Sequence, residues 1–256
     1  MLRTLVRKAL FQVGYELRPL GRKGWHPVYL HVDGELARFE RPRWDPTYIR
    51  TLGFSPATVV DVGVAGGTPS LYDSFPTAEL VLIEPQTECE DELRAILRHR
   101  RGSYHLVAVS DREGTGTLYI DPERERSSLE QRVGPELDNR ALLPREVRLT
   151  TLDSLLEEIH PPTPYGLKLD VEGEELAVLH GARRMLEETE FVIAEVPLIE
   201  RYSDGYLFSE IVAFLADAGF ELRDVLDLGR ALSGQQTGEA TFIDAVFDRR
   251  TKGTWP

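Results

Sequence analysis

Residues 58–67 combine an apolar run, an aspartate and a glycine-rich turn, and this combination suits the binding of a nucleotide. The stretch reads TVVDVGVAGG, with Asp61 inside the run and Gly63 and Gly67 in the turn. Glycines let a backbone approach a ligand closely and adopt positive φ angles. The next apolar run, AELVLIEP, carries Glu84 near its end. The two oxygens of a carboxylate at that place can accept hydrogen bonds from both hydroxyls of a ribose.

The residue types in the turn also distinguish between two classes of nucleotide cofactor. A dinucleotide fingerprint counted from Gly63 requires glycines at positions that Ala65 and Thr68 occupy here. The pyrophosphate of a dinucleotide would also lie unfavourably close to Asp61. A carboxylate instead suits a cation such as the ammonium of a methionyl group. The residues therefore favour S-adenosylmethionine over NAD(P).

A second set of acidic residues occurs in the stretch KLDVEGEE, and the next apolar run, FVIAEVP, carries Glu195 near its end. Lys168 and Asp170 share one face of an extended strand, because side chains alternate along it. Asp170 comes at the carboxyl end of that strand, and Glu172 follows it. Several carboxylates at neighbouring strand ends are costly unless a cation, a donor or a substrate is bound. We therefore interpret this set as part of a functional site.

With both sets in this order, the chain resembles the FkbM family of S-adenosylmethionine-dependent methyltransferases. The resemblance covers roughly residues 55–250 and rests on VVDVGVAGG, VLIEP, VAVSDREGTGTLYI, TTLDSLL and LKLDVEGEELAVLHGA. The LD-x-EG-x-E core is its most specific part. The resemblance implies a Rossmann-like class I methyltransferase domain, similar to enzymes that methylate hydroxyl groups, often on sugars, glycans or macrolide-type natural products.

The resemblance also implies roles for single residues around the donor, for its methionyl end, its ribose and its adenine. Asp61, Gly63 and Gly67 are expected at the methionyl end. Glu84 and Pro85 are expected at the ribose, and Ser110 and Asp111 at the adenine. Ala65 belongs to the same turn, but relatives often carry Asn or another polar residue there, so one side-chain contact differs. The pair Ser127-Ser128, followed by Leu129, matches a serine pair common in relatives and is interpreted as part of a lid.

Methyl transfer to an alcohol requires a group that removes the hydroxyl proton, or a divalent metal that lowers the hydroxyl pKa. We predict Asp170 as this base or as a metal ligand, with Glu172, Glu195 and Lys168 in support. If a metal such as Mg²⁺ takes part, Asp170 and Glu172 are its predicted ligands, and the spacing leaves metal dependence open. The aromatic segment at 200–208 either presents tyrosines to a sugar or packs in the core.

Apolar runs alternate with helical patterns from residue 58 onward, which is typical of βαβ units and a parallel sheet. The last two runs, FELRDVLDL and ATFIDAVFDRR, have no helix between them and are predicted to pair antiparallel. This pattern predicts an α/β fold, and the resemblance implies that it is a Rossmann-like class I methyltransferase fold. Its seven-stranded, mostly parallel sheet has one antiparallel strand at its end and helices on both faces.

Two segments lie outside this alternation. Residues 1–54 form a predicted extension with an amphipathic helix, a short strand pair around Asp33-Gly34 and a helix after Asp45-Pro46. Residues 55–250 form the methyltransferase domain, and 112–150 interrupt it with an extra strand, EGTGTLYID, and a long polar loop. The N-terminal helix has two interpretations: packing on its own domain or a second subunit, or contact with an anionic membrane surface.

Composition narrows the function classes. The formal net charge of −13 argues against a nucleic-acid partner, because phosphate binding depends on Lys and Arg. A single cysteine excludes an internal disulfide, and no apolar run approaches the ~18 residues of a membrane span. The start of the chain lacks a convincing secretory signal, so a cytoplasmic protein is expected.

Three functions remain as predictions. The first is O-methylation of a hydroxyl on a sugar, glycan or glycosylated metabolite. The second is O-methylation of a polyketide-type secondary metabolite. From a different class, the third is a nucleotide-sugar oxidoreductase or epimerase.

Overall fold

The computed structural model describes residues 15–20, 24–29, 43–122, 126–133, 142–203, 205–229 and 240–249. The chain divides into two units, Met1–Arg41 and Pro42–Pro256. In the first unit, β1 (Tyr15–Leu20) pairs antiparallel with β2 (Gly24–Tyr29). The predicted N-terminal amphipathic helix and the predicted turn at Asp33-Gly34 lie outside the described residues.

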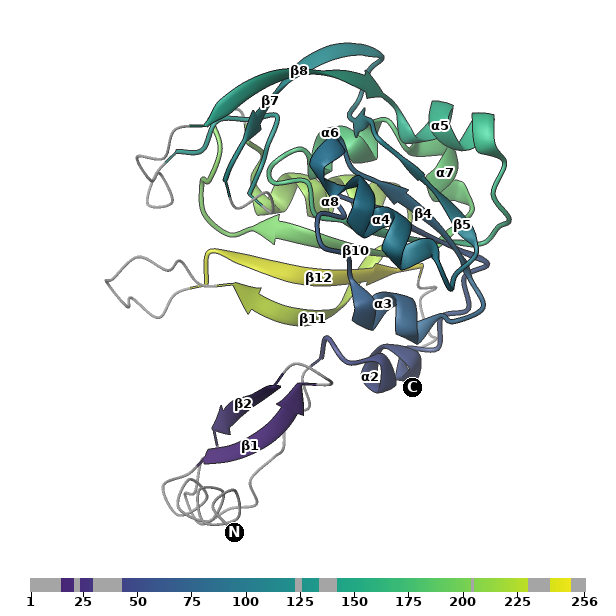
Figure 1. Cartoon of the computed structure of the whole chain (residues 1–256), viewed down its shortest axis with the longest axis vertical. Helices are drawn as coiled ribbons and strands as arrows, with labels where there is room; N and C mark the ends of the chain where they lie inside the picture. Colours follow the sequence, from purple (N-terminus) through teal and green to yellow (C-terminus); the bar gives the residue numbers. More distant parts are fainter. Residues whose placement is uncertain are drawn as a thin grey trace. The chain divides into compact units, whose positions relative to one another are not determined.

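The main sheet of the second unit has seven strands in the order β11-β12-β10-β9-β3-β4-β5 (Figure 1). Their bounds are β3 (Thr58–Val62), β4 (Glu79–Ile83), β5 (Gly102–His105), β9 (Tyr165–Leu169), β10 (Thr189–Pro197), β11 (Glu221–Gly229) and β12 (Phe242–Asp248). β12 runs in the direction opposite to that of the other six strands of this sheet. The predicted fold class and strand directions are confirmed.

The antiparallel strand differs from the prediction in its position, because β12 lies between β10 and β11 and not at the end of the sheet. The two strands differ in polarity. Most side chains of β12 are buried, whereas those of β11 are mostly exposed or half-buried. The more polar strand therefore takes the edge, where one side of it meets solvent.

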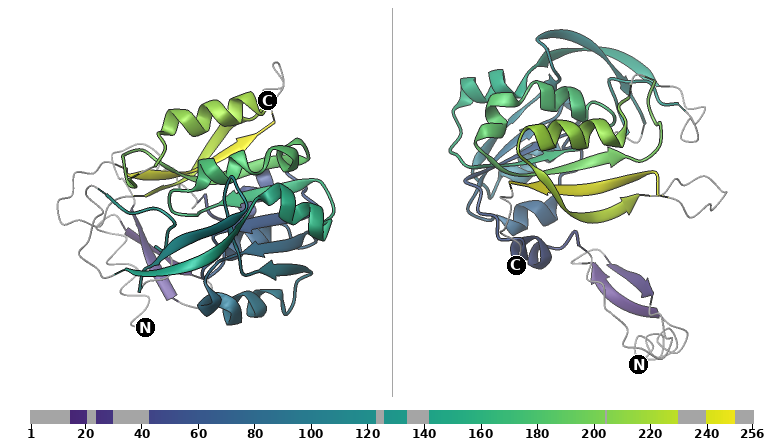
Figure 2. Two further views of the ribbon diagram at one scale, coloured as in Figure 1. Left: turned by 90° about the horizontal axis from the view of Figure 1, so that it is seen from above. Right: turned by 180° about the vertical axis from the view of Figure 1, so that it is seen from behind.

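Helices cover both faces of the main sheet (Figures 1 and 2). One face packs against α2 (Pro46–Thr51), α3 (Pro69–Ser74) and α4 (Glu90–Leu97), which follows the 3-10 turn η1 (Thr87–Cys89). The other packs against α5 (Leu152–Ile159), α6 (Glu175–His180), α7 (Arg183–Glu187) and α8 (Phe208–Asp217). Asp45 caps α2 by accepting hydrogen bonds from the amides of Thr47 and Tyr48, as a residue preceding a helix-starting proline is suited to do.

The stretch EELAVLHGARRMLEE has a helical pattern throughout, but the structure divides it into α6 and α7. The break occurs at Gly181, where a Cβ atom would lie 2.2 Å from the Ser110 carbonyl oxygen. The close approach of that loop interrupts the helix and brings its first half to the end of β9.

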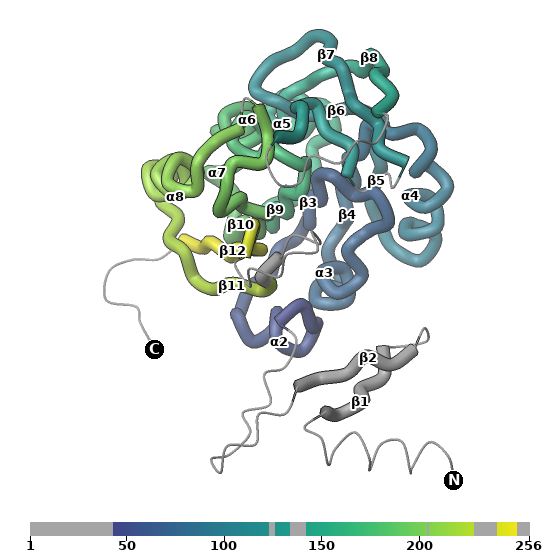
Figure 3. Tube along the Cα trace, turned by 90° about the vertical axis from the view of Figure 1, so that its left-hand side faces the viewer, coloured from purple at the N-terminus to yellow at the C-terminus, as the bar shows by residue number. Residues whose placement is uncertain are grey.

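The segment 112–150 contains more regular structure than the predicted long loop. The expected extra strand is present as β7 (Gly114–Ile120), and it pairs antiparallel with a strand that was not predicted, β8 (Leu143–Thr150). Together with β6 (Ala108–Val109) they form a separate three-stranded sheet. Figure 3 shows this small sheet at the top of the view, near α5 and α6 and away from α2 and α3. The apolar stretch YHLVAVSD is therefore divided between β5 and β6.

Among the described residues, no helix combines the length and the apolar character needed to cross a bilayer.

Candidate functional site

A pocket lies where β3, β4 and β9 end, which is the edge at which parallel sheets bind ligands. Residues from six segments line it, and four of these segments contribute Gly63 and Ala65; Glu84, Pro85 and Gln86; Val107, Ala108 and Val109; and Asp170, Val171 and Glu172. Six of the predicted site residues are among them: Gly63, Ala65, Glu84, Pro85, Asp170 and Glu172. The structure thus brings both acidic sets of the sequence to one place.

The glycine turn fits between the ends of the neighbouring strands. Gly63 has a φ of 80°, and a Cβ atom on it would lie 1.8 Å from the Asp170 carbonyl oxygen. Its amide donates to the carbonyl of Ile83 at 3.0 Å, and the amide of Asp170 donates to the carbonyl of Val62 at the same distance. The glycine turn can therefore contact the end of β9 because Gly63 has no side chain.

Glu84 is 3% exposed, and its carboxylate is held against the turn. One oxygen accepts a hydrogen bond from the Ala65 amide at 2.9 Å. The other accepts from the amide and the side chain of Gln86, at 3.0 and 3.1 Å. Burial raises the pKa of Glu84, and these three donors oppose the rise. A carboxylate fixed in this way at a pocket wall is suited to accepting hydrogen bonds from a diol.

Asp61 lies behind the pocket and does not line it. It is fully buried, and its Oδ2 accepts a hydrogen bond from the Tyr72 hydroxyl at 2.5 Å. The Lys168 ammonium lies 3.6 Å from its Oδ1 and 3.1 Å from Asp170 Oδ2. Burial alone would lower the pKa of Lys168, but the carboxylates of Asp170 and Asp61 outweigh it and raise that pKa. The role predicted for Asp61 toward the methionyl group stays a prediction.

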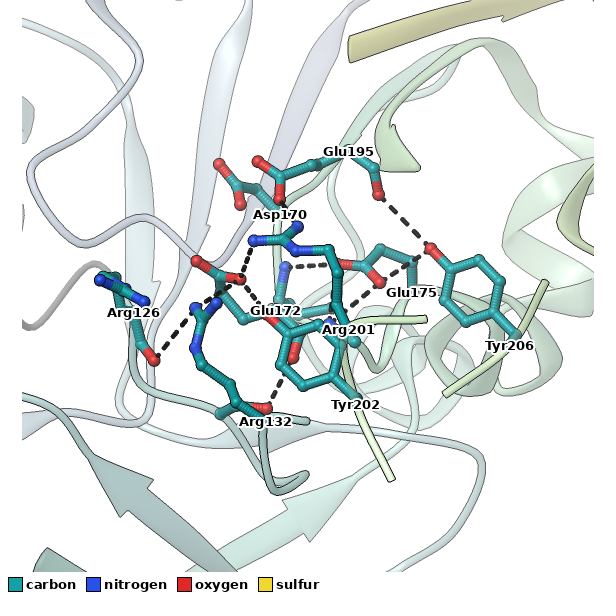
Figure 4. A network of polar contacts seen from close by, with 12 residues as sticks. Arg126, Arg132, Asp170, Glu172, Glu175, Glu195, Arg201, Tyr202 and Tyr206 are labelled. Atoms are coloured by element: carbon teal, nitrogen blue, oxygen red, sulfur yellow. Dashed lines mark hydrogen bonds and ion pairs between the residues drawn. The ribbon is translucent and has the colours of Figure 1, made fainter. Parts of the chain in front are cut away.

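Glu172 is the centre of a buried polar network (Figure 4). It is 8% exposed and adopts a left-handed backbone conformation, with φ of 54°. Its Oε2 lies 2.8 Å from the Arg132 guanidinium and 3.2 Å from that of Arg201, and it also accepts a hydrogen bond from the Tyr202 hydroxyl. Burial raises the pKa of Glu172, although both arginines act to lower it.

Arg201 continues this network to Glu195, with which it forms a second ion pair. Burial, followed by the charges of Asp170 and Glu172, raises the pKa of Glu195 well above its usual value. Glu195 does not line the pocket.

Glu175 and two tyrosines complete the network. The carboxylate of Glu175 accepts hydrogen bonds from the Val171 and Gly173 amides and, at 2.9 Å, from the Tyr206 hydroxyl. Burial raises its pKa to about 7. Tyr202 and Tyr206 are 2% and 9% exposed, so the structure supports packing and not presentation to a sugar.

Ser110 and Asp111 do not line the pocket. Ser110 is buried and donates its hydroxyl to Glu174 at 3.0 Å, whereas Asp111 is exposed and pairs with Arg112. Gly67 also lies outside the lining residues. Ser127, Ser128 and Leu129 do line the pocket, so the predicted lid segment is in place next to it. The roles assigned to these residues stay predictions.

Arg132 and Arg201 were not found by sequence reasoning. Each is separated from Glu172 by about thirty or forty positions in a segment of no clear periodicity, and a lone arginine in such a segment resembles a solvated one. Gln86 was missed as well, although its position directly after the predicted VLIEP strand end was a usable signal.

The two predicted metal ligands do not fit a divalent cation. Two guanidinium groups and a hydroxyl already surround the Glu172 carboxylate, and the ammonium of Lys168 lies against Asp170. No group of three or more His, Cys, Asp or Glu side chains within the described ranges is arranged to hold a metal ion. We therefore derive no step through a metal.

The sequence of this chain is similar to those of known methyltransferases. The model of the "Methyltransferase FkbM domain" family matches residues 61–222. The curated protein "Methyltransferase sdnD" from Sordaria araneosa is 27% identical over 196 residues, which are 64% of this chain and 73% of that protein.

Solved structures of methyltransferases are also similar. Methyltransferase FkbM from Methylobacillus flagellatus KT has a TM-score of 0.47 at 17% identity, over 82% of this chain and 48% of that one. This chain thus spans about half the length of that protein. Magnesium protoporphyrin IX methyltransferase from Synechocystis PCC 6803, solved with bound SAM, has a TM-score of 0.45 at 10% identity, over 80% and 76% of the two chains.

The family match covers more than half of the chain and includes both acidic sets that converge on the pocket. It excludes the alternative of a nucleotide-sugar oxidoreductase or epimerase. The chain belongs to the FkbM family of S-adenosylmethionine-dependent methyltransferases.

Proposed function

We propose that this protein transfers the methyl group of S-adenosylmethionine to a hydroxyl oxygen of a sugar, glycan or glycosylated metabolite. The observation that carries the proposal is the position of Asp170. Its carboxylate lines the pocket, 36% of its side chain is exposed, and the buried ammonium of Lys168 holds it in place. A carboxylate that is both accessible and fixed can meet an acceptor hydroxyl at the donor.

The pocket residues are matched to the parts of the donor. Glu84 accepts hydrogen bonds from the ribose hydroxyls, and the backbone of the turn from Gly63 to Ala65 passes along the methionyl end. Apolar side chains from β6 and β7, including Val109 and Leu118, provide a surface for the adenine. Burial of an aromatic base against such side chains favours binding.

The chemistry is an in-line displacement. The acceptor oxygen attacks the methyl carbon, the carbon–sulfur bond breaks, and its electron pair returns to sulfur to give S-adenosylhomocysteine. The hydroxyl proton passes to Asp170 and from there to solvent. Holding the oxygen about 3 Å from the methyl group supplies much of the rate. We assign Glu195, whose pKa is raised by burial, a supporting role in accepting the proton.

Chemistry and charge support a sugar as the acceptor. A sugar offers hydroxyls that donate hydrogen bonds, which suits the accessible carboxylate of Asp170 at the pocket. The net charge of −13 further supports an acceptor other than nucleic acid.

The test uses S-adenosylmethionine labelled at its methyl group with two panels of acceptors, one of glycosides and one of polyketide aglycones. We expect label in the glycoside products at a hydroxyl oxygen, and at least a hundredfold slower transfer by Asp170→Asn. Glu88→Gln, an exposed carboxylate near the pocket, serves as the matched control. Transfer to the aglycones alone would replace this proposal by the polyketide alternative.

A further inference from the structure

Residues 126–133, which we call the strap, form part of the lining of the donor pocket. Ser127, Ser128 and Leu129 line the pocket together with Glu84 and Gln86. Backbone hydrogen bonds between Ser128 and Tyr119 join the strap to β7. A donor in the pocket would therefore lie against the strap.

One end of the strap is held at the pocket by neutral groups. The Ser127 hydroxyl donates a hydrogen bond to the side-chain oxygen of Gln86 at 3.0 Å. The side-chain amide of Gln86 in turn donates to Glu84, the predicted ribose ligand. The same Ser127 oxygen accepts a hydrogen bond from the Asp121 amide at 3.0 Å. The contact between Ser127 and Gln86 thus joins the strap to the segment that carries Glu84.

The other end is held by charged and backbone groups. Arg132 lies 2.8 Å from Glu172, and both side chains are at most one-tenth exposed. The Val133 amide donates to the Arg201 carbonyl at 2.8 Å, and the Ser203 amide to the Gln131 carbonyl at 2.9 Å. Nearer the middle of the strap, the Ser128 hydroxyl donates to the backbone oxygen of Glu172 at 2.6 Å.

The contact between Ser127 and Gln86 and the contact between Arg132 and Glu172 therefore differ in strength. A hydrogen bond between neutral side chains contributes less than a buried, charge-assisted pair supported by backbone hydrogen bonds. When the strap moves, the contact at Ser127 breaks before the contacts at Ser128 and Arg132.

We propose that the contact between Ser127 and Gln86 is a gate through which S-adenosylmethionine enters and S-adenosylhomocysteine leaves, and that the ion pair between Arg132 and Glu172 is the anchor on which the strap opens. Ser127 then sets the exchange rate of the donor, and Arg132 is a positioning residue that keeps the strap over the pocket. This inference rests on the donor pocket of the proposed function.

The gate differs in kinetics from a simple contact with the donor. A side chain that only binds the donor slows its dissociation, so that its removal raises the dissociation rate alone. A gate lies on the path in both directions, so that its removal raises the association and dissociation rates together and changes the equilibrium constant little.

Stopped-flow measurement of S-adenosylhomocysteine binding to the full chain tests the proposal. For Ser127→Ala we expect both rate constants to rise about three- to tenfold, the range expected for one neutral hydrogen bond. The equilibrium constant should stay within about twofold. The control is Ser103→Ala, on a half-buried strand serine that contacts His105 and lies outside the pocket lining.

Arg132→Gln tests the anchor. We expect at least about tenfold weaker binding of S-adenosylhomocysteine, because the strap loses its position and Glu172 keeps Arg201 as its remaining arginine. Arg145→Gln is the matched control, since it removes an exposed ion pair with Glu88 that also joins this part of the chain to the segment after β4.

The outcomes are distinguishable. A rise in the dissociation rate alone for Ser127→Ala, or unchanged rates, would overturn the gate while leaving the donor pocket intact. Absence of S-adenosylhomocysteine binding to the wild type would overturn the donor pocket and the gate with it. If circular dichroism shows that Arg132→Gln does not fold, the rates of Ser127→Ala decide alone.

Discussion

The ammonium of Lys168 lies 3.6 Å from the carboxylate of Asp61, and both side chains are almost completely buried. The two residues face each other on the paired central strands β3 and β9. Among the described residues, Asp61 Oδ1 has no hydrogen-bond partner and so depends on the charge of Lys168. This buried pair lies directly beneath the turn that forms the donor pocket.

Replacement of Lys168 by Met should therefore destabilise the fold severely. It leaves the buried carboxylate of Asp61 without its cation, and breaking such a pair on one side typically costs about 3–5 kcal/mol. Urea unfolding measures the loss. The double variant Lys168→Met/Asp61→Asn should recover part of it, since neither charge remains. Arg94→Met, which removes an exposed pair with Glu90, should cost less than about 1 kcal/mol. Equal losses in the two single variants would contradict the argument.

Glu175 predicts a specific pH dependence of stability. Its pKa is raised by burial from 4.5 to about 7 in the folded protein. Between these values the folded state keeps a proton that the unfolded state has released, so the free energy of unfolding falls as the pH rises. The stabilisation of the folded state by protonated Glu175 is complete below about pH 4.5 and is lost above about pH 7.

We expect Glu175→Gln to remove this part of the pH dependence. The stability of the wild type relative to the variant should decrease by up to about 3 kcal/mol between pH 4.5 and pH 8. Comparing the two proteins at each pH cancels the titration of the other buried carboxylates. Glu187→Gln, on an exposed helix position, should leave the wild-type pH profile unchanged. A parallel shift of the Glu175→Gln curve at all pH values would argue against a raised pKa.

Donor binding should depend on Glu84. In Glu84→Ala the ribose loses a charged acceptor, and we expect S-adenosylhomocysteine to bind more weakly by about 1.5–3 kcal/mol, or roughly ten- to a hundredfold. Isothermal titration calorimetry gives the comparison. Glu88→Gln, four positions along the chain and exposed, should bind as the wild type does. Undiminished affinity in Glu84→Ala would show that the carboxylate supports only the turn.

The turn itself can be tested with two glycines of similar backbone conformation. Gly63 and Gly53 have φ angles of 80° and 84°, so alanine meets comparable backbone strain at each, on the order of 1–2 kcal/mol. A Cβ atom at Gly53 meets nothing within 4 Å, whereas one at Gly63 clashes with the carbonyl of Asp170. Gly63→Ala should therefore be much less stable than Gly53→Ala in thermal unfolding and should lose donor binding. Similar losses in both variants would mean that the close approach is not required.

Periodicity and strand-end residues were sufficient to predict the fold class and the position of the pocket. The carboxyl ends of parallel strands meet at one edge, so Glu84 and Asp170 could be placed together without knowledge of the strand order. The break at Gly181 could not be predicted, because it depends on a loop from Ser110 that approaches from a distant part of the chain.

The partners of the charged residues were also beyond the sequence. Asp61 was predicted to attract a ligand cation, but a lysine of the neighbouring strand occupies its immediate surroundings. Likewise, Arg132 and Arg201 meet at Glu172 only because the strap pairs with residues 201–203. Such pairings arise from tertiary contacts and leave no periodic pattern in the chain.

The position of β12 has a consequence for biosynthesis. All residues that line the donor pocket precede residue 175, whereas β12 spans Phe242–Asp248 and is inserted between two strands made earlier. Until that segment leaves the ribosome, the exposed edge of β10 lacks its partner. A nascent chain could therefore hold the donor-binding half in place while β10 and β11 are still open to pairing with another chain. Unpaired strand edges of this kind are sites at which chains can associate, so β12 protects the sheet from aggregation once it is in place.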